Sequence, residues 1–166
     1  MRTGLRIRVW LVIVLSVLML GAACTPSGPM VWVESSSAVQ VNNEVTVPIK
    51  AGDIADLTAL EIHLSFDPGI LEVIRLDAGD FLAPDFVVQN TFDNTAGTID
   101  YAAAQINRAP ANGSGTLLKI VFRTKAGGDS PLKFRMMQAA PAGVLLADSS
   151  GLAIEVSLKD GNIKVK

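Results

Sequence analysis

The chain has 166 residues, with 14 Lys and Arg against 16 Asp and Glu, and aromatic residues make up only 5% of it. Without the first 23 residues, which include Arg2, Arg6 and Arg8, 11 basic residues remain against 16 acidic ones, a net charge of −5. An acidic domain lacks the basic surface that nucleic acids and anionic lipids require, so the composition argues against both as partners. The length suffices for one domain with its own core.

Residues 1–23 have the pattern of a secretory signal peptide. Three arginines precede an apolar run from Val9 to Leu20 that only Ser16 interrupts, and small residues follow. The run is shorter than the roughly 20 residues of a membrane-spanning helix. A basic start, a short apolar segment and a small-residue cleavage site together predict export.

Cys24 is the only cysteine, so the exported domain has no internal disulfide and depends on its core. The string "LGAAC" resembles a bacterial lipobox, which implies a lipidated Cys24, although Gly21 stands where a larger aliphatic residue is usual. Plain secretion and a retained anchor are the alternatives. With lipidation, the membrane is reached only through the N-terminal lipid. Residues 24–30 then form a short tether, and residues 31–166 form the domain.

From Val31 onward the pattern is that of β-structure. Glycine, proline, asparagine and aspartate clusters recur roughly every 8 to 15 residues between alternating runs. This spacing predicts an all-β sandwich or barrel of about nine or ten strands.

Two of these runs present a polar or small-residue face. In residues 57–66 the apolar side chains are Leu60, Ile62, Leu64 and Phe66, and the opposite face carries Ala59, Glu61, His63 and Ser65. In residues 98–105, Ile99, Tyr101 and Ala103 share one face, and Asp100, Ala102 and Ala104 share the other. Because side chains alternate along a strand, the first set in each run should lie in the core. His63, the only histidine, is then expected on the solvent face.

The C-terminal segment "LAIEVSLKDGNIKVK" carries Asp160-Gly161 between two alternating runs. This dipeptide is the signal of a two-residue type I′ hairpin. The pattern therefore predicts that Leu158 pairs with Ile163 and Val156 with Val165.

Four segments, in order, resemble a cohesin domain: "EVTVPIKA", "LTALEIHLSFDPGILEVI", "GTLLKIVFRTKA" and "KDGNIKV". The resemblance implies a nine-stranded jelly-roll β-sandwich without a catalytic centre, one sheet face of which binds a dockerin-type protein. Glu61 matches a partner-contacting acid of the family, whereas Ala59 stands where many members have asparagine. The partner-binding face is expected to comprise Ala59, Glu61, His63, Ser65, Asp100, Ala102, Ala104 and Gln105.

Catalysis and metal binding are not indicated. His63 is the only imidazole and no nucleophile-elbow motif accompanies it, so the sequence predicts neither an enzyme nor a cofactor. Acidic residues near turns, Asp77 with Asp80 and Asp93 with Asn94 and Asp100, lack the spacing of an EF-hand loop. Turn and capping roles are therefore expected for them, and no metal site is predicted.

The main alternative is a carbohydrate-binding module tethered to the cell surface, with a polysaccharide as partner. Such modules need exposed aromatic rings, and the domain has few candidates, namely Trp32, Tyr101 and six phenylalanines. Tyr101, Phe66 and Phe122 fall on inward positions, Trp32 stands at the start of the domain, and Phe81 and Phe86 flank "LAPD". A sandwich that has lost its partner is a third interpretation. The favoured hypothesis is a monomeric, non-catalytic, lipid-anchored module on the outer face of the cell membrane or at the cell surface, in extracellular scaffolding or polysaccharide-degrading assemblies.

Overall fold

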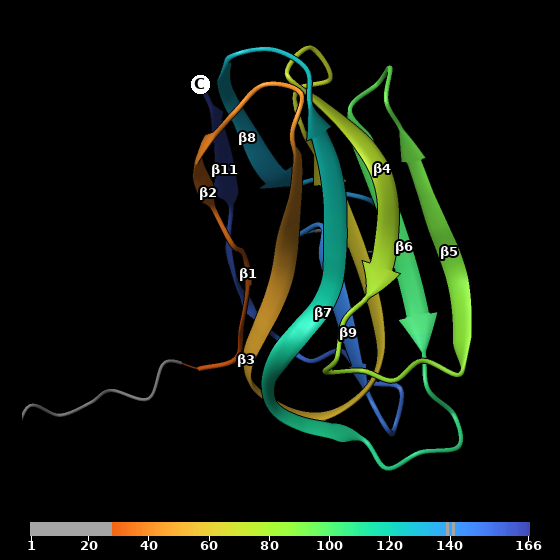
Figure 1. Ribbon diagram of the computed structural model, residues 1–166. Helices are drawn as coiled ribbons and strands as arrows, with labels where there is room; N and C mark the ends of the chain where they lie inside the picture. The colour runs from red at the N-terminus through yellow and green to blue at the C-terminus, as the bar shows by residue number, and fades with distance from the viewer. Residues whose placement is uncertain (1–27, 139, 141) are drawn as a thin grey trace, which may run out of the picture.

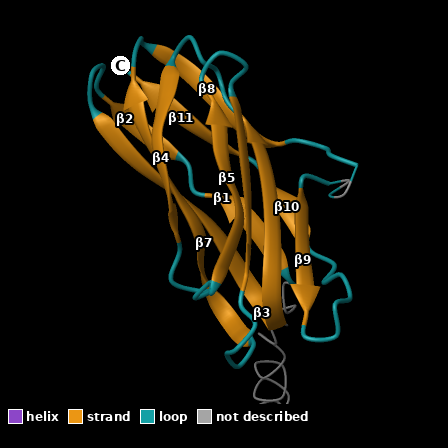
Figure 2. Ribbon diagram, turned by 90° about the vertical axis from the view of Figure 1, so that its right-hand side faces the viewer, coloured by secondary structure: helices purple, strands orange, loops and turns teal. Residues whose placement is uncertain are grey.

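The structure, a computed structural model, describes residues 28–138, 140 and 142–166. All regular elements in this part of the chain are strands (Figure 2), and it contains no helix able to cross a membrane. The expected signal peptide in residues 1–23 and the lipidation of Cys24 lie outside the described residues, as does most of the tether in residues 24–30.

The described residues form eleven strands, which Figure 1 labels in chain order. They are β1 (Met30–Val33), β2 (Ser36–Val39), β3 (Glu44–Ser65), β4 (Leu71–Ala78), β5 (Phe86–Asp93), β6 (Thr98–Ala104), β7 (Ala111–Thr124), β8 (Gly128–Phe134), β9 (Val144–Asp148), β10 (Ser157–Lys159) and β11 (Gly161–Val165).

Strand β3 belongs to both layers of the sandwich. Its first half lies between β1 and β7, where Ile49 is opposite Val33 and Leu118. Its second half lies between β6 and β9. The bend between them shifts the register with β7 and places Asp53 and Asp56 at positive φ, 56° and 62°. Such a bulged bend lets one strand change layers.

The predicted all-β jelly-roll sandwich is confirmed, but the number of strands differs from the predicted nine. Strand β4 flanks β7 in one layer, and β5 flanks β6 in the other. The long strand β3 counts once although it serves both layers, while the short strands β2 and β10 count separately.

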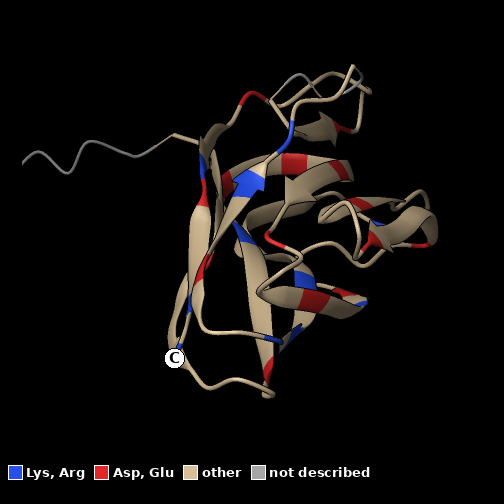
Figure 3. Ribbon diagram, turned by 90° about the horizontal axis from the view of Figure 1, so that it is seen from above, with Lys and Arg blue, Asp and Glu red and all other residues tan. Residues whose placement is uncertain are grey.

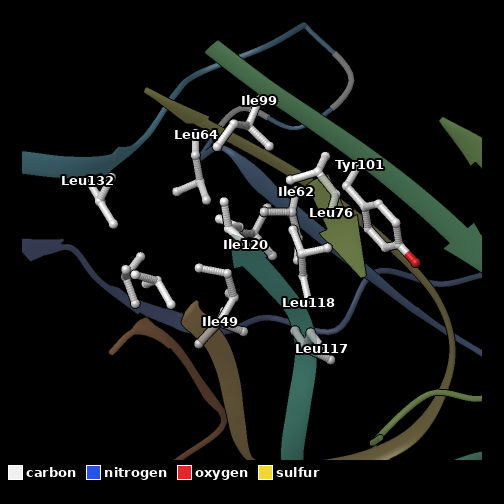
Figure 4. Close-up of a cluster of buried hydrophobic side chains, with 14 of the residues drawn as sticks. Ile49, Ile62, Leu64, Leu76, Ile99, Tyr101, Leu117, Leu118, Ile120 and Leu132 are labelled. Atoms are coloured by element: carbon white, nitrogen blue, oxygen red, sulfur yellow. The ribbon is translucent and has the colours of Figure 1, made fainter. Parts of the chain in front are cut away.

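The core fills the space between the layers, and Figure 4 shows part of it. Ile62 and Tyr101 from one layer are buried together with Ile120 from the other. The rings of Phe66 and Phe122 meet edge to face with centroids 5.4 Å apart, and burial raises the pKa of Tyr101. The inward positions expected from alternation are confirmed. The core runs from Val31 to Val165, so residues 28–166 contain all of the buried core cluster.

The predicted Asp-Pro-Gly turn connects β3 to β4. The Asp67 carboxylate accepts the Gly69 N–H at 2.8 Å, and the Asp67 carbonyl accepts the Leu71 N–H at 2.9 Å. This side-chain bond is the usual Asx contribution to a turn.

The predicted C-terminal hairpin is wrong. Strand β10 pairs in parallel with β1, whereas β11 pairs with β8 and β2. The Asp160 carboxylate accepts the N–H of Phe134 at 3.0 Å. A Cβ on Gly161 would lie 2.7 Å from Cγ1 of Val33 and 3.0 Å from its carbonyl oxygen. Asp160 and Gly161 therefore form a tightly packed connection between β10 and β11, two strands that do not pair with each other.

Gly161→Ala is expected to lower the free energy of unfolding by about 1–3 kcal/mol, because the added methyl overlaps Val33. Urea denaturation of residues 28–166 measures the change. Gly127→Ala is the matched control, since the nearest atom to its Cβ would be the Val165 carbonyl oxygen at 3.8 Å. Equal stability of the two variants would contradict this packing role.

The turn between β5 and β6 is held by an aspartate. The Asp93 carboxylate accepts the N–H groups of Ala96 at 2.9 Å and Thr95 at 2.7 Å. These two donors hold the pKa of Asp93 below its ordinary value of 3.8.

This bonding predicts acid sensitivity. Since the pKa is lower in the folded state than in the unfolded chain, the stabilisation is complete above the unfolded value and is lost as the pH falls through the folded value. Unfolding measured at neutral pH and at about pH 3 should therefore show a smaller pH-dependent loss of stability in Asp93→Asn than in the parent. An unchanged pH dependence would contradict the role of this carboxylate.

Candidate binding face

The candidate site lies on the outer face of the layer formed by β5, β6, the second half of β3, and β9. Ala59 is opposite Ala104 on β6 and Ala147 on β9. Glu61 is opposite Ala102 and Leu145. The small side chains leave a shallow depression of about 220 Å³, here called the alanine depression. It is lined by Ala59, Leu60, Glu61, Val88, Ala102, Ala103, Ala104, Leu145 and Ala147.

Exposed apolar side chains gather around this layer. Among the described residues, the strongly exposed large apolar side chains lie on β5 or in loops adjoining β6, β8 and β9, and none lies on any strand other than β5. They are Phe86, Val87, Val88, Phe92, Ile106, Met136, Met137 and Leu152. Charged residues, in contrast, are scattered over the ribbon with both signs interspersed (Figure 3). Apolar side chains gathered in this way mark a surface for interaction.

A charged cluster borders the alanine depression. Nδ1 of His63 lies 2.6 Å from Oδ1 of Asp100, and Nε2 lies 2.6 Å from Oε1 of Glu61. Arg135 also pairs with Asp100, and its backbone N–H donates to the His63 carbonyl at 2.9 Å. Two acids and two bases thus share one network.

His63 is buried, which corrects the expectation that it lies on the solvent face. Only 2% of it is exposed, because Arg135 and Gly143, at the two ends of the connection from β8 to β9, bond to its backbone and the carboxylates of Glu61 and Asp100 meet its ring. At the two ends of the connection, Arg135 N–H donates to the His63 carbonyl, and the Gly143 carbonyl accepts the His63 N–H at 2.8 Å. Both ring nitrogens face carboxylates, so neither is free to activate a nucleophilic hydroxyl.

Six of the other seven expected face residues lie where the alternation places them: Ala59, Glu61, Ser65, Asp100, Ala102 and Ala104. Gln105 does not. It is 6% exposed, and its side-chain amide donates to the Ala109 carbonyl at 2.8 Å. One residue beyond Ala104 the chain turns inward, so Gln105 holds the following loop and is not on the face.

Comparisons with known proteins identify the family. A family model described as Cohesin domain matches residues 30–165. The chain belongs to the cohesin domain family. A search of curated proteins gave no significant match.

Solved cohesin structures share the fold. A type II cohesin domain from the cellulosome of Acetivibrio cellulolyticus is 20% identical, with a TM-score of 0.71 over 82% of this chain and 95% of that one. A chain in a type I cohesin–dockerin complex from Clostridium thermocellum is 16% identical, with a TM-score of 0.70 over 84% of this chain and 99% of that one. A non-cellulosomal cohesin from the archaeon Archaeoglobus fulgidus is 18% identical, with a TM-score of 0.66 over 84% of this chain and 91% of that one.

Several contributors to the site of this cohesin domain were not found from the sequence. Arg135 comes from a loop and follows no periodic pattern. Val88 sits at a bulge in β5 that shifts the register with β6, so alternation does not reveal its face. Leu145 and Ala147 alternate within "VLLAD", but the run is too short to locate its neighbour.

Of the polar residues near turns that were set against an EF-hand loop, Asp80, Asp93 and Asn94 bond backbone groups as expected, whereas Asp77 pairs with Arg75 and Asp100 with His63 and Arg135. Asp80 accepts the Thr116 N–H at 2.9 Å, and the Asn94 side chain bonds the backbone of Val73. Within residues 28–138, 140 and 142–166, no group of three His, Cys, Asp or Glu side chains could hold a metal ion.

The aromatic residues do not support the carbohydrate alternative. Phe86 is opposite Ala104 and Phe92 is opposite Ile99, so the two exposed rings of β5 lie on opposite faces. Phe81 packs against the core. Trp32 lies in the other layer, opposite Lys50. These rings therefore form no common stacking platform.

Proposed function

We propose that this cohesin domain binds a dockerin-type protein through the alanine depression. The observation that carries the proposal is the shallow alanine-lined depression, which Glu61 borders and beside which Phe86 and Val88 are exposed. Family membership supports it, as do the similar structures described as cohesin–dockerin complexes. The role is non-catalytic binding within an extracellular assembly.

The depression suits a partner that approaches closely. Four alanines in its lining, Ala59, Ala102, Ala104 and Ala147, provide apolar contact without protruding side chains. Glu61 is 26% exposed and has Oε1 engaged by His63, which leaves Oε2 available to a partner hydroxyl or base. Asp100 is already paired with His63 and Arg135. Specific polar recognition is therefore assigned to Glu61.

Calorimetric titration of residues 28–166 with dockerin domains encoded by the same genome, in calcium-containing buffer, tests the proposal. A saturable one-to-one complex with at least one of them is expected. Failure of every such domain to bind would overturn the dockerin assignment.

The location proposed for the domain is the outer face of the cell membrane or the cell surface, with the lipid on Cys24 as the anchor. The basic and apolar start of the chain and the string "LGAAC" support this location. Metabolic labelling with palmitate tests it, and a label that persists in Cys24→Ser would contradict it.

A further inference from the structure

The outer edge of β5 is an unpaired strand edge. Among the described strands, β5 pairs only with β6, and Figure 1 shows no strand beyond it. Seven of its eight residues are exposed. They include Phe86 at 57%, Val88 at 65% and Phe92 at 38%. The strand therefore presents free backbone donors and acceptors together with apolar side chains.

Protection of this edge is slight. Sheet edges are normally blunted by charged side chains, proline, bulges or short length. The sequence of β5, "FVVQNTFD", has no lysine, arginine or proline, and its one charged residue is the terminal Asp93. The bulge at Val88 leaves Gln89–Asp93 in regular pairing with β6. Strand β4, an edge of the other layer, carries Glu72, Arg75 and Asp77 in contrast.

We propose that β5 pairs antiparallel with β5 of a second copy of the chain, in place of the monomer expected from the sequence. The segment of β5 before Asp93 is uncharged, so it meets no like charge when it pairs with its own copy, whereas β4 paired with its own copy would bring Glu72, Arg75 and Asp77 together with like charges nearby. Its valines, phenylalanines and threonine are residues that favour strands. A twofold axis perpendicular to the sheet satisfies both edges at once, so the assembly closes as a dimer.

The same axis places the outer faces of both copies on one side of a continuous sheet. The strand order becomes β3, β6, β5 and then β5, β6, β3 of the second copy. Five interstrand spacings separate the two β3 strands by about 24 Å. If the alanine depression binds a dockerin-type partner as proposed, the dimer presents two depressions side by side to a partner with two binding modules. This consequence rests on the proposed function. The pairing itself does not depend on that function.

Sedimentation velocity of residues 28–166 without any partner, from micromolar to millimolar concentrations, tests the pairing. The mass should rise from monomer to dimer and no further. Asn90→Lys places an inward-pointing charge on β5, and it should weaken dimerisation at least tenfold. Phe92→Lys should do the same. Asn107→Lys, which adds the same charge in the loop after β6, is the control and should dimerise like the parent.

Single cysteines at Gln89, Asn90 and Thr91 provide a second measurement, because residues 28–166 have no cysteine of their own. A twofold axis brings one position opposite itself, within disulfide distance, so one of the three variants should cross-link rapidly. Arg75→Cys on β4 should not. A parent that stays monomeric, growth beyond the dimer, or a dimer that survives both lysine variants would overturn the pairing. Dockerin binding that persists in monomeric Asn90→Lys would leave the proposed function intact.

Discussion

The double variant Glu61→Ala with Ala102→Arg is expected to bind the dockerin-type partner at least a hundredfold more weakly. Arginine at position 102 fills the alanine depression, and alanine at position 61 removes the acceptor at its border. Changes at the hot-spot residues of an interface cost about 2 kcal/mol or more each, and about 1.4 kcal/mol corresponds to a tenfold change in affinity. Calorimetric titration against the dockerin identified above measures the loss.

The control is a double variant that also replaces one glutamate by alanine and one alanine by arginine, but at positions outside the alanine depression. Glu44→Ala with Ala126→Arg alters an exposed acid at the start of β3 and an exposed alanine after β7. It should bind like the parent. Thermal unfolding should show that both double variants remain folded. Binding that survives in the first variant would show that the partner uses another surface.

His63→Ala is expected to lower the free energy of unfolding by about 2–3 kcal/mol. The change leaves Glu61 and Asp100 without the imidazole between them and opens space in a site where His63 is 2% exposed. The partial exposure of both carboxylates, 26% and 20%, limits the cost. Urea denaturation measures the effect.

A double-mutant cycle separates the network from simple loss of packing. Asp100→Ala alone also breaks the contacts with His63 and Arg135. The variant that combines His63→Ala with Asp100→Ala should lose less stability than the two single variants together, by about 1 kcal/mol or more. Ser65→Ala, on the same strand and face, should change stability by less than about 0.5 kcal/mol. Additive single effects would refute the coupling.

Asp80 and Asp93 hold backbone groups near turns. The sequence predicts capping roles for Asp80 and Asp93, and the structure places both carboxylates on backbone N–H groups. The pKa of each is lowered, chiefly by those bonds. These contacts are local in sequence for Asp93, whereas Asp80, in the loop after β4, bonds to Thr116 on β7.

Alternation alone determined which side of residues 57–66 and of residues 98–104 faces the core. Leu60, Ile62 and Tyr101 lie in the core because successive side chains point to opposite faces and only one face excludes water. The Asp-Pro-Gly turn was likewise predictable, since proline and glycine constrain the backbone locally. The four family segments also led to the cohesin fold, which the family match confirms.

Only the tertiary structure decided what covers those faces and edges. His63 is buried because a loop more than 70 residues later in the sequence brings Arg135 beside Asp100. Asp160-Gly161 has the sequence of a hairpin turn, yet the strands on either side of it do not pair with each other. Strand β10 pairs with the edge of β1, and β11 pairs with the edge of β8. Alternation also gives no sign that one edge of β5 is unpaired, because it reports on the faces of a strand and not on its edges. Pairing between distant strands depends on the packing of the whole sandwich, and local periodicity carries no information about it.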